Sequence, residues 1–103
     1  MGPGKITLLH AIQDTGSISA AARSMNMSYR RAWMLVATMN RCFQEPIVEA
    51  APGGLGGGGA KLTELGLTVL KKYEAMETIA LNAVDQHLKR FSELLAEQPP
   101  DET

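Results

Sequence analysis

The sequence predicts a mostly α-helical fold, in which three short helices and a two-stranded hairpin are followed by one long helix. Three observations favour this fold. Apolar residues recur at helical spacing through residues 5–44. A glycine-rich stretch then separates two short strand-like runs, residues 47–50 and 60–63. Finally, residues 64–98 carry an apolar stripe without a proline until Pro99 and Pro100.

The composition is that of one small globular domain. The chain has 103 residues, of which 45% are hydrophobic and 20% are charged, and this is enough for a modest core. No apolar run approaches the length of about 18 residues that a membrane span needs, and the N-terminus lacks the pattern of a secretory signal. Cys42 is the only cysteine, which fits a reducing compartment. We therefore expect a cytoplasmic protein.

The net charge of −1 conceals an uneven distribution of charge along the chain. Residues 1–63 carry a net charge of +3, whereas residues 64–103 carry −4. Attraction to phosphate depends on local positive surface rather than on the total charge. A basic front with an acidic back is therefore compatible with nucleic-acid binding.

The first two helices are short and closely spaced. We expect the first over Lys5–Asp14, ended by Gly16 in a left-handed conformation. The second is expected over Ser19–Met25, with the Ser17 hydroxyl accepting a hydrogen bond from a backbone N–H as its N-cap. Asn26 breaks the run after an alanine-rich face that allows another helix to approach closely.

The third helix is expected over Tyr29–Gln44, with Ser28 as its N-cap and Pro46 just beyond its end. The stripe that we expect to face the core is Ala32, Trp33, Val36, Met39, Asn40 and Phe43. The outer face then carries Arg30, Met34 and Arg41. The order of a short alanine-rich helix, a tight turn and a longer basic helix is that of a helix-turn-helix, whose second helix enters a DNA groove.

Arginines near the start of such a helix can donate hydrogen bonds to guanine or to phosphates. Arg30 and Arg31 are therefore the main candidates for DNA contact, against the alternative of an ordinary solvated pair. Tyr29 either contacts the DNA backbone through its hydroxyl or packs against the second helix. Ser28 acts first as a cap and secondly as a candidate phosphate contact.

The two strand-like runs, Ile47–Ala50 and Ala60–Thr63, predict a hairpin that forms a wing beside the helices. Its glycine loop can approach a DNA backbone closely, and Lys61 on the returning strand is a candidate phosphate contact. The loop also matches a dinucleotide-binding glycine pattern. The context excludes that interpretation, because a short strand rather than a helix follows the glycines.

The long helix opens at Thr63 and Glu64 and is expected to run to about Gln98. Its apolar stripe is too wide for a projecting helix without a partner. The simplest partner is a second copy of the chain, related by a two-fold axis. The residues expected in this dimer contact are Leu70, Tyr73, Ala80, Val84, Phe91 and Leu94. The chain thus divides into a winged helix-turn-helix, 1–63, a dimerisation helix, 64–98, and a flexible tail, 99–103.

Several of these motifs together resemble a known family. Thr15–Arg23, Met27–Trp33, Met39–Asn40 and the glycine loop Gly53–Ala60 followed by Leu62 and Thr63 are similar to the ModE family in order and spacing. These are bacterial molybdate-responsive regulators with a LysR-like winged helix-turn-helix domain. The resemblance implies a dimerising DNA-binding domain, with Ser28–Gln44 as recognition helix and the glycine loop as wing. Members also carry a molybdate-binding domain, for which a chain ending at Thr103 has no room, so we expect no molybdate site here.

We therefore expect a homodimeric, DNA-binding transcriptional regulator without cofactor, metal or catalytic site. The expected DNA contacts are Ser28, Tyr29, Arg30, Arg31, Met34, Lys61, Gly56 and Gly57. His10 and His87 lie apart from residues at metal-ligand spacing. One alternative is a protein-interaction module that kept the fold without reading DNA, and another is an enzyme that binds a nucleotide through the glycine loop.

Overall fold

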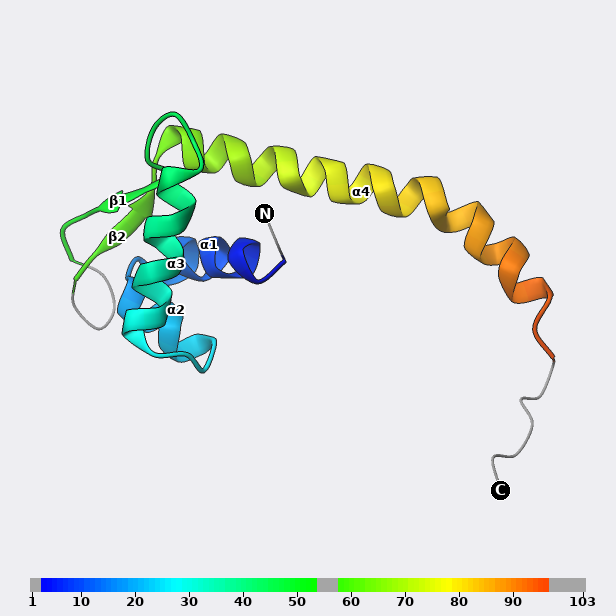
Figure 1. The fold of residues 1–103 in the computed structure, drawn as a ribbon, viewed down its shortest axis with the longest axis horizontal. Helices are drawn as coiled ribbons and strands as arrows, with labels where there is room; N and C mark the ends of the chain where they lie inside the picture. Colours follow the sequence, from blue (N-terminus) through cyan, green and yellow to red (C-terminus); the bar gives the residue numbers. More distant parts are fainter. Residues whose placement is uncertain (1–2, 54–57, 97–103) are drawn as a thin grey trace, which may run out of the picture. The chain divides into compact units, whose positions relative to one another are not determined.

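The computed structural model describes residues 3–53 and 58–96. The chain divides into two units, Met1–Lys71 and Lys72–Thr103. In chain order, its elements are α1 Pro3–Thr15, α2 Ile18–Ser24, α3 Tyr29–Arg41, β1 Val48–Ala50, β2 Ala60–Leu62 and α4 Glu64–Glu93 (Figure 1). The predicted fold, a winged helix-turn-helix followed by a long helix, is confirmed.

A sharp turn joins α1 to α2. Gly16 has a φ of 71°, the left-handed conformation that favours glycine. Ser17 is the N-cap of α2, and its hydroxyl accepts a hydrogen bond of 2.9 Å from the Ala20 N–H. Both roles were predicted from the sequence. The capped turn fixes the direction in which α2 leaves α1.

The turn between α2 and α3 is built in the same way. Asn26 has a φ of 54°, a conformation that asparagine tolerates better than most residues. The Ser28 hydroxyl accepts a hydrogen bond of 3.1 Å from the Arg31 N–H and so caps α3. The helix-turn-helix is thus held at both helix starts by serine side chains.

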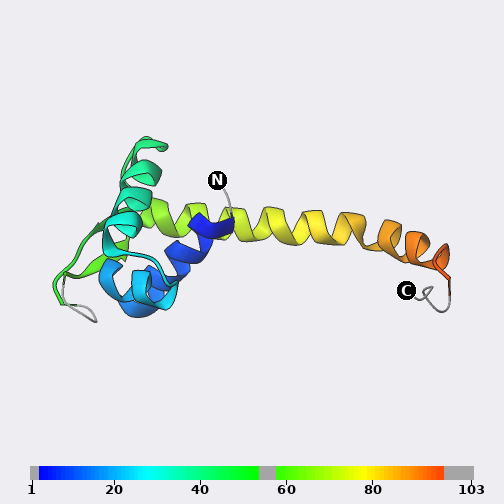
Figure 2. The same ribbon diagram turned by 60° about the horizontal axis from the view of Figure 1, so that its bottom comes forward.

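The core of the first unit collects apolar residues from several elements. Leu8, Leu9 and Ile12 of α1 are fully buried, together with Met39 of α3 and Ile47 before β1. α2 packs against both α1 and α3, and β2 packs against α1. Figure 2 shows the three helices gathered beside the hairpin.

The wing is an antiparallel pair in which Val48 faces Leu62 and Ala50 faces Ala60. The Ala60 N–H donates a hydrogen bond of 2.9 Å to the Gly16 carbonyl, and Ser17 and Gly59 form an isolated bridge. These contacts join the returning strand to the α1–α2 turn. The wing is therefore held against the helices at its loop end, where β2 begins.

The start of α4 belongs to the first unit. Thr63 caps it, because its hydroxyl accepts a hydrogen bond of 3.0 Å from the Gly66 N–H while donating one of 2.8 Å to the Pro46 carbonyl. A side chain at Gly66 would collide with the Ile47 carbonyl oxygen. Leu70 is only 4% exposed. The compact unit thus extends through Lys71, past the boundary that we expected at residue 63.

Two helices end earlier than the sequence suggested. α3 ends at Arg41 rather than at Gln44, because the Cys42 N–H turns back to the Met39 carbonyl as a C-cap. α4 ends at Glu93, where a looser turn follows through Leu94. The expected tail, residues 99–103, lies outside the described residues.

Two side chains differ from the expected burial. Trp33, which we placed in the core, is 53% exposed, because Ala32 and Val36 occupy the inward side of α3 and leave Trp33 on its flank. Leu70, which we expected in the dimer contact, is buried within the first unit. It is therefore not available for a contact with a second copy of the chain. In the second unit the described side chains are exposed, apart from the half-buried Tyr73. Across residues 3–53 and 58–96, no helix has the length and apolar character needed to cross a membrane.

Candidate nucleic-acid interface

α3 is an amphipathic helix whose outer side is basic. Ala32, Val36 and Met39 are buried on its inner side. Arg30 and Arg31 lie exposed near its start, and Met34 is 55% exposed one turn later. The packing of the inner side therefore fixes which side chains the helix presents outward.

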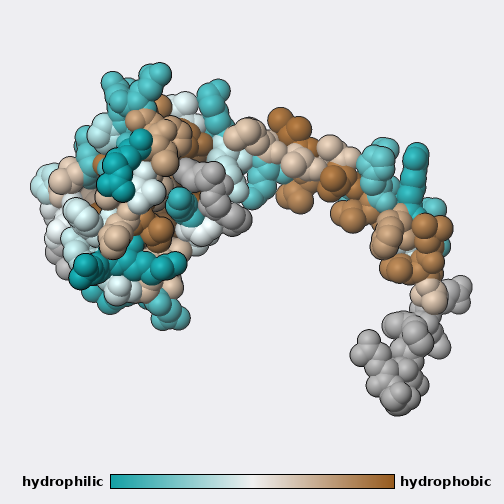
Figure 3. Space-filling view, viewed as in Figure 1, coloured by the Kyte–Doolittle hydropathy of each residue, from teal (hydrophilic) through white to brown (hydrophobic). Residues whose placement is uncertain are grey.

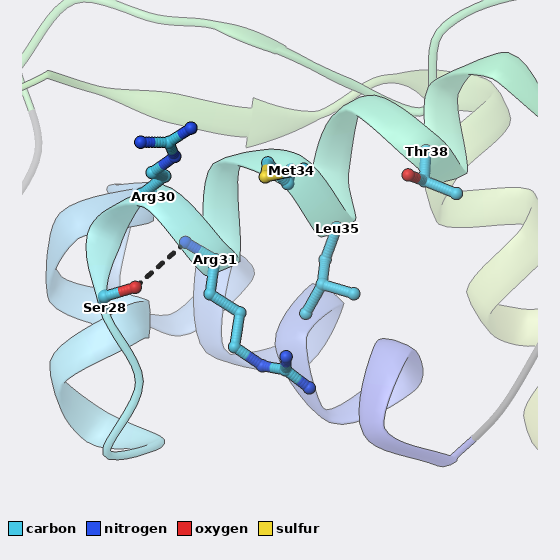
Figure 4. A pocket seen from close by; sticks show the side chains of 6 residues that line it. All are labelled: Ser28, Arg30, Arg31, Met34, Leu35 and Thr38. Atoms are coloured by element: carbon cyan, nitrogen blue, oxygen red, sulfur yellow. Dashed lines mark hydrogen bonds between the residues drawn. The ribbon is translucent and has the colours of Figure 1, made fainter.

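The two guanidinium groups extend from α3 in different directions. Arg30 points to the side of the strands and Arg31 to the opposite side (Figure 4). Neither has an ion-pair or hydrogen-bond partner for its guanidinium in the described part of the chain. Each group keeps all five of its N–H donors available for a ligand.

A shallow depression of about 390 Å³ lies between these arginines (Figure 4). Besides Arg30 and Arg31, its walls are formed by Ser28, Met34, Leu35 and Thr38. The depression thus combines two cations with apolar and hydroxyl groups. Such a surface can meet an anionic ligand that also has apolar parts.

The start of α3 adds the positive end of the helix dipole to the two arginines. Ser28 is exposed, and its hydroxyl accepts from the Arg31 N–H. Its carbonyl accepts a hydrogen bond of 3.1 Å from the Ala32 N–H. The N–H groups of the first turn of a helix lack partners within the helix and favour anions. The cap and the two arginines therefore place positive potential at the same end of α3.

A second groove, of about 340 Å³, lies on the other flank of α3, next to the wing. Tyr29 and Trp33 line it from the helix, and Ala50 and Gly59 line it from the hairpin. Tyr29 is 55% exposed, and Ile18 of α2 lines the same groove, so both alternatives considered for Tyr29 stay open. That Tyr29 and Trp33 share one flank was not predicted, although their spacing of one helical turn could have indicated it.

Lys61, a predicted phosphate contact, lies on the exposed side of β2. Its ammonium is 3.7 Å from a Glu49 carboxylate oxygen, and both side chains are at least half exposed. An exposed pair of this kind contributes about 0–1 kcal/mol, so a phosphate can displace the carboxylate at little cost.

The glycine loop is described only at its ends. Gly56 and Gly57, two of the expected DNA contacts, lie outside the described residues, as does most of the nucleotide-like glycine pattern. Gly58 has a φ of 56°. A side chain at Gly59 would collide with the carbonyl oxygens of Ala51 and Gly53. The described end of the loop therefore requires glycine for steric reasons.

Asn40 links α3 to the wing, a role that was not predicted from the sequence. The Asn40 side chain forms hydrogen bonds with the backbone at Ile47 and Val48. We had placed Asn40 in the apolar stripe, where its amide would have had no assigned role. Asn40 instead positions β1 relative to α3 and its basic outer side.

Within the same described residues, no three His, Cys, Asp or Glu side chains gather in a way that could hold a metal ion. His10 lies in α1 and His87 in α4. The free Cys42 is exposed at the end of α3.

Comparison with known families agrees with this architecture. The model of the bacterial regulatory helix-turn-helix proteins of the lysR family matches residues 4–67. The chain belongs to this LysR family. The matched range contains nearly all of α1, then α2, α3, the wing and the first turn of α4, and it includes the basic outer side of α3.

Two curated relatives link this LysR-family chain to molybdenum-related proteins. It is 51% identical to the molybdenum-pterin-binding protein MopB of Rhodobacter capsulatus over 77 residues. These residues make up 75% of this chain and 28% of MopB. It is 40% identical to the DNA-binding transcriptional dual regulator ModE of Escherichia coli K12 over 83 residues. These residues make up 81% of this chain and 32% of ModE. The resemblance to ModE is confirmed, and the chain spans about a third or less of the length of these relatives.

A solved structure of the LysR type has the same fold. The chain in the crystal structure of the CbnR_DBD–DNA complex superposes with a TM-score of 0.66 at 17% identity, over 87% of this chain and 98% of that one. Likeness at this identity shows the fold, a winged helix-turn-helix with a following long helix.

Proposed function

We propose that this LysR-family chain is the DNA-binding part of a transcriptional regulator and that α3 enters the major groove. The observation that carries the proposal is the pair of guanidinium groups on the capped start of α3, which have no partner among residues 3–53 and 58–96. Arginine donates two hydrogen bonds to guanine O6 and N7, the commonest specific contact in the major groove. DNA binding is also part of the name of the ModE relative. Since bacterial DNA lies in the cytoplasm, we expect the protein there.

The expected contacts divide into two kinds. We assign base reading to Arg30, which shares the outer side of α3 with Met34. We assign phosphate contact to Arg31, Ser28, the Tyr29 hydroxyl and Lys61, because such contacts position a protein on the duplex without reading its sequence. We also propose that Gly56 and Gly57 allow the wing to approach the DNA backbone closely.

We further propose that the second unit mediates homodimerisation. Apolar side chains gather along the later turns of α4 (Figure 3). Val84, Phe91 and Leu94 are exposed, at 45%, 62% and 82%, and Tyr73 and Ala80 share their stripe. A patch of this kind on a single helix marks an interaction surface, and closed symmetric pairs are the commonest assemblies. Two-fold symmetry then predicts a palindromic site whose halves lie about 34 Å apart or a multiple of this.

The names of the relatives suggest which genes are regulated. MopB is named for molybdenum-pterin binding. We propose that the regulated genes serve molybdenum uptake or use, without a molybdate site in the described residues. Measurement of transcripts in a strain that lacks the gene, with and without molybdate, tests this proposal. Unchanged transcripts of molybdenum-related genes would contradict it.

The second candidate function is that of a protein-interaction module that does not read DNA. The net charge of −4 on residues 64–103 and the pairing of Lys61 with Glu49 favour it. In this case the stripe on α4 would bind a different polypeptide, such as a longer regulator of the same family.

A binding titration at several salt concentrations separates the two functions. DNA fragments are first selected from a random pool with the purified protein, and binding is then followed by anisotropy. The proposed regulator binds with a logarithmic salt slope of about −0.9 per phosphate contact. The double variant Arg30→Ala/Arg31→Ala should lose specific binding and reduce the slope.

The matched control is Lys71→Ala/Lys72→Ala, which removes the same charge from exposed positions on α4. It should leave the affinity for the selected DNA within about twofold. No selectable DNA, or equal losses in both double variants, would favour the interaction module. Circular dichroism checks that all variants are folded.

A further inference from the structure

The groove between α3 and the wing contains an aromatic pair that the contacts proposed above do not use fully. Tyr29 and Trp33 lie one helical turn apart on the same flank of α3 and are 55% and 53% exposed. The buried residues Val36 and Ala60 line the groove from the helix and from the hairpin, and the exposed Ala50 also lines it. The result is a partly apolar recess of about 340 Å³ at the edge of the basic face.

Exposure of this pair has a physical cost. Large aromatic side chains contribute most of their stabilisation when they are covered, and here about half of each remains in water. The adjacent core has no place for these two rings, because Ala32 and Val36 already fill the inward side of α3. The aromatic flank is therefore suited to a ligand rather than to the protein interior.

The position of the flank indicates what covers it. Tyr29 precedes Arg30 in α3, and Trp33 precedes Met34, so the aromatic flank and the outer side of the helix are continuous. The major groove is about 12 Å wide, and a helix with its side chains has a diameter of about 10–12 Å. A duplex that receives the outer side of α3 must therefore also lie against this flank.

The charges beside the recess agree with such a ligand. Glu49 is its one acidic lining residue, and its half-exposed carboxylate can turn into solvent when Lys61, 3.7 Å away, contacts a phosphate. Arg30 lies at the adjoining edge and extends to the side of the strands (Figure 4). The recess thus presents two aromatic rings with the positive charge of Arg30 beside them.

We propose that Trp33, supported by Tyr29, reads thymine by contact with its C5-methyl group in the major groove. That methyl group is the apolar feature that distinguishes thymine from the other bases in the major groove. Trp33 thereby acts as a second specificity determinant beside Arg30. This inference rests on the proposed DNA-binding function.

The test replaces single thymines of a selected DNA site by deoxyuridine, which removes the methyl group and leaves all base pairing intact. At one or two positions the wild-type protein should bind roughly fourfold more weakly, the effect of uncovering one methyl-sized group. The variant Trp33→Ala should bind the thymine site at least as weakly as the wild-type protein binds the deoxyuridine site. Replacement of thymine by deoxyuridine should then weaken its binding no further. Trp33→Phe, which keeps an aromatic ring, should retain part of the dependence.

A second measurement uses the chain's one tryptophan. Because Trp33 is half exposed in the free protein, its emission should shift to shorter wavelength or be quenched when selected DNA saturates the protein. Emission that does not change while anisotropy reports binding would overturn the inference. Equal binding of thymine and deoxyuridine sites, or full methyl dependence in Trp33→Ala, would also overturn it and leave the proposed function intact. If no DNA can be selected, both this inference and the proposed DNA-binding function fail.

Discussion

The side chain of Asn40 binds both backbone polar groups of Val48. Its Nδ2 donates to the Val48 carbonyl at 3.1 Å, and its Oδ1 accepts from the Val48 N–H at 3.1 Å. The same oxygen accepts from the Ile47 N–H at 2.9 Å. One amide thus pairs with β1 as a neighbouring strand would, and it connects the last turn of α3 to the wing.

We predict that Asn40→Ala destabilises the protein by about 2–4 kcal/mol, because it leaves three partly buried backbone groups without partners. Asn40→Asp should also destabilise, since one oxygen still accepts from both N–H groups but the second replaces the donor and repels the Val48 carbonyl. Urea unfolding followed by circular dichroism measures both variants. Gln44→Ala, an exposed change nearby, serves as control. A loss below about 0.5 kcal/mol in Asn40→Ala would show that the clamp is unimportant.

The contact of Gly66 with the strand region gives a second prediction. A methyl group at this position would overlap the Ile47 carbonyl oxygen, so Gly66→Ala should destabilise by about 1–3 kcal/mol despite the better helix propensity of alanine. Gly4→Ala is the control, because nothing lies within 4 Å of an added Cβ there. Thermal unfolding should show a lower midpoint temperature for Gly66→Ala and an unchanged or higher one for Gly4→Ala. An equal stabilisation of both would contradict the packing described here.

Leu70 and Leu88 lie in the same helix, but they should respond differently to truncation. Leu70 is 4% exposed and Leu88 is 60% exposed. Leu70→Ala should therefore lower the free energy of unfolding of the first unit by about 2–5 kcal/mol. Leu88→Ala should leave that value nearly unchanged, because its side chain lies in the second unit. Site-resolved hydrogen exchange in α1–α3 distinguishes the two variants, and similar effects would argue against the burial of Leu70.

The proposed dimer contact makes a fourth prediction. Val84→Lys places a charge in the exposed apolar stripe and should shift the protein from dimer to monomer in sedimentation velocity at micromolar concentration. Asn82→Lys adds the same charge two residues away, on another face of the helix, and should leave the dimer intact. A wild-type chain that sediments as a monomer, or a dimer that survives Val84→Lys, would exclude this contact.

Much of the fold could be predicted because its signals are local. Ser17, Ser28 and Thr63 cap helices through bonds to N–H groups three residues later, and Gly16 takes the left-handed conformation that glycine favours. The exposure of Arg30 and Arg31 follows from the helical period of the apolar residues around them. These features depend on neighbouring residues, so the order of residues was sufficient.

The sequence by itself thus determined the helix starts, the turns, the wing and the basic face of α3. The tertiary structure decided that Trp33 lies exposed beside the wing, that Leu70 belongs to the core, and that Asn40 holds β1. The physical reason is that periodicity indicates which side of a helix is apolar but not which neighbour covers each position. That depends on contacts between residues far apart in the chain, which exist only after the elements have packed.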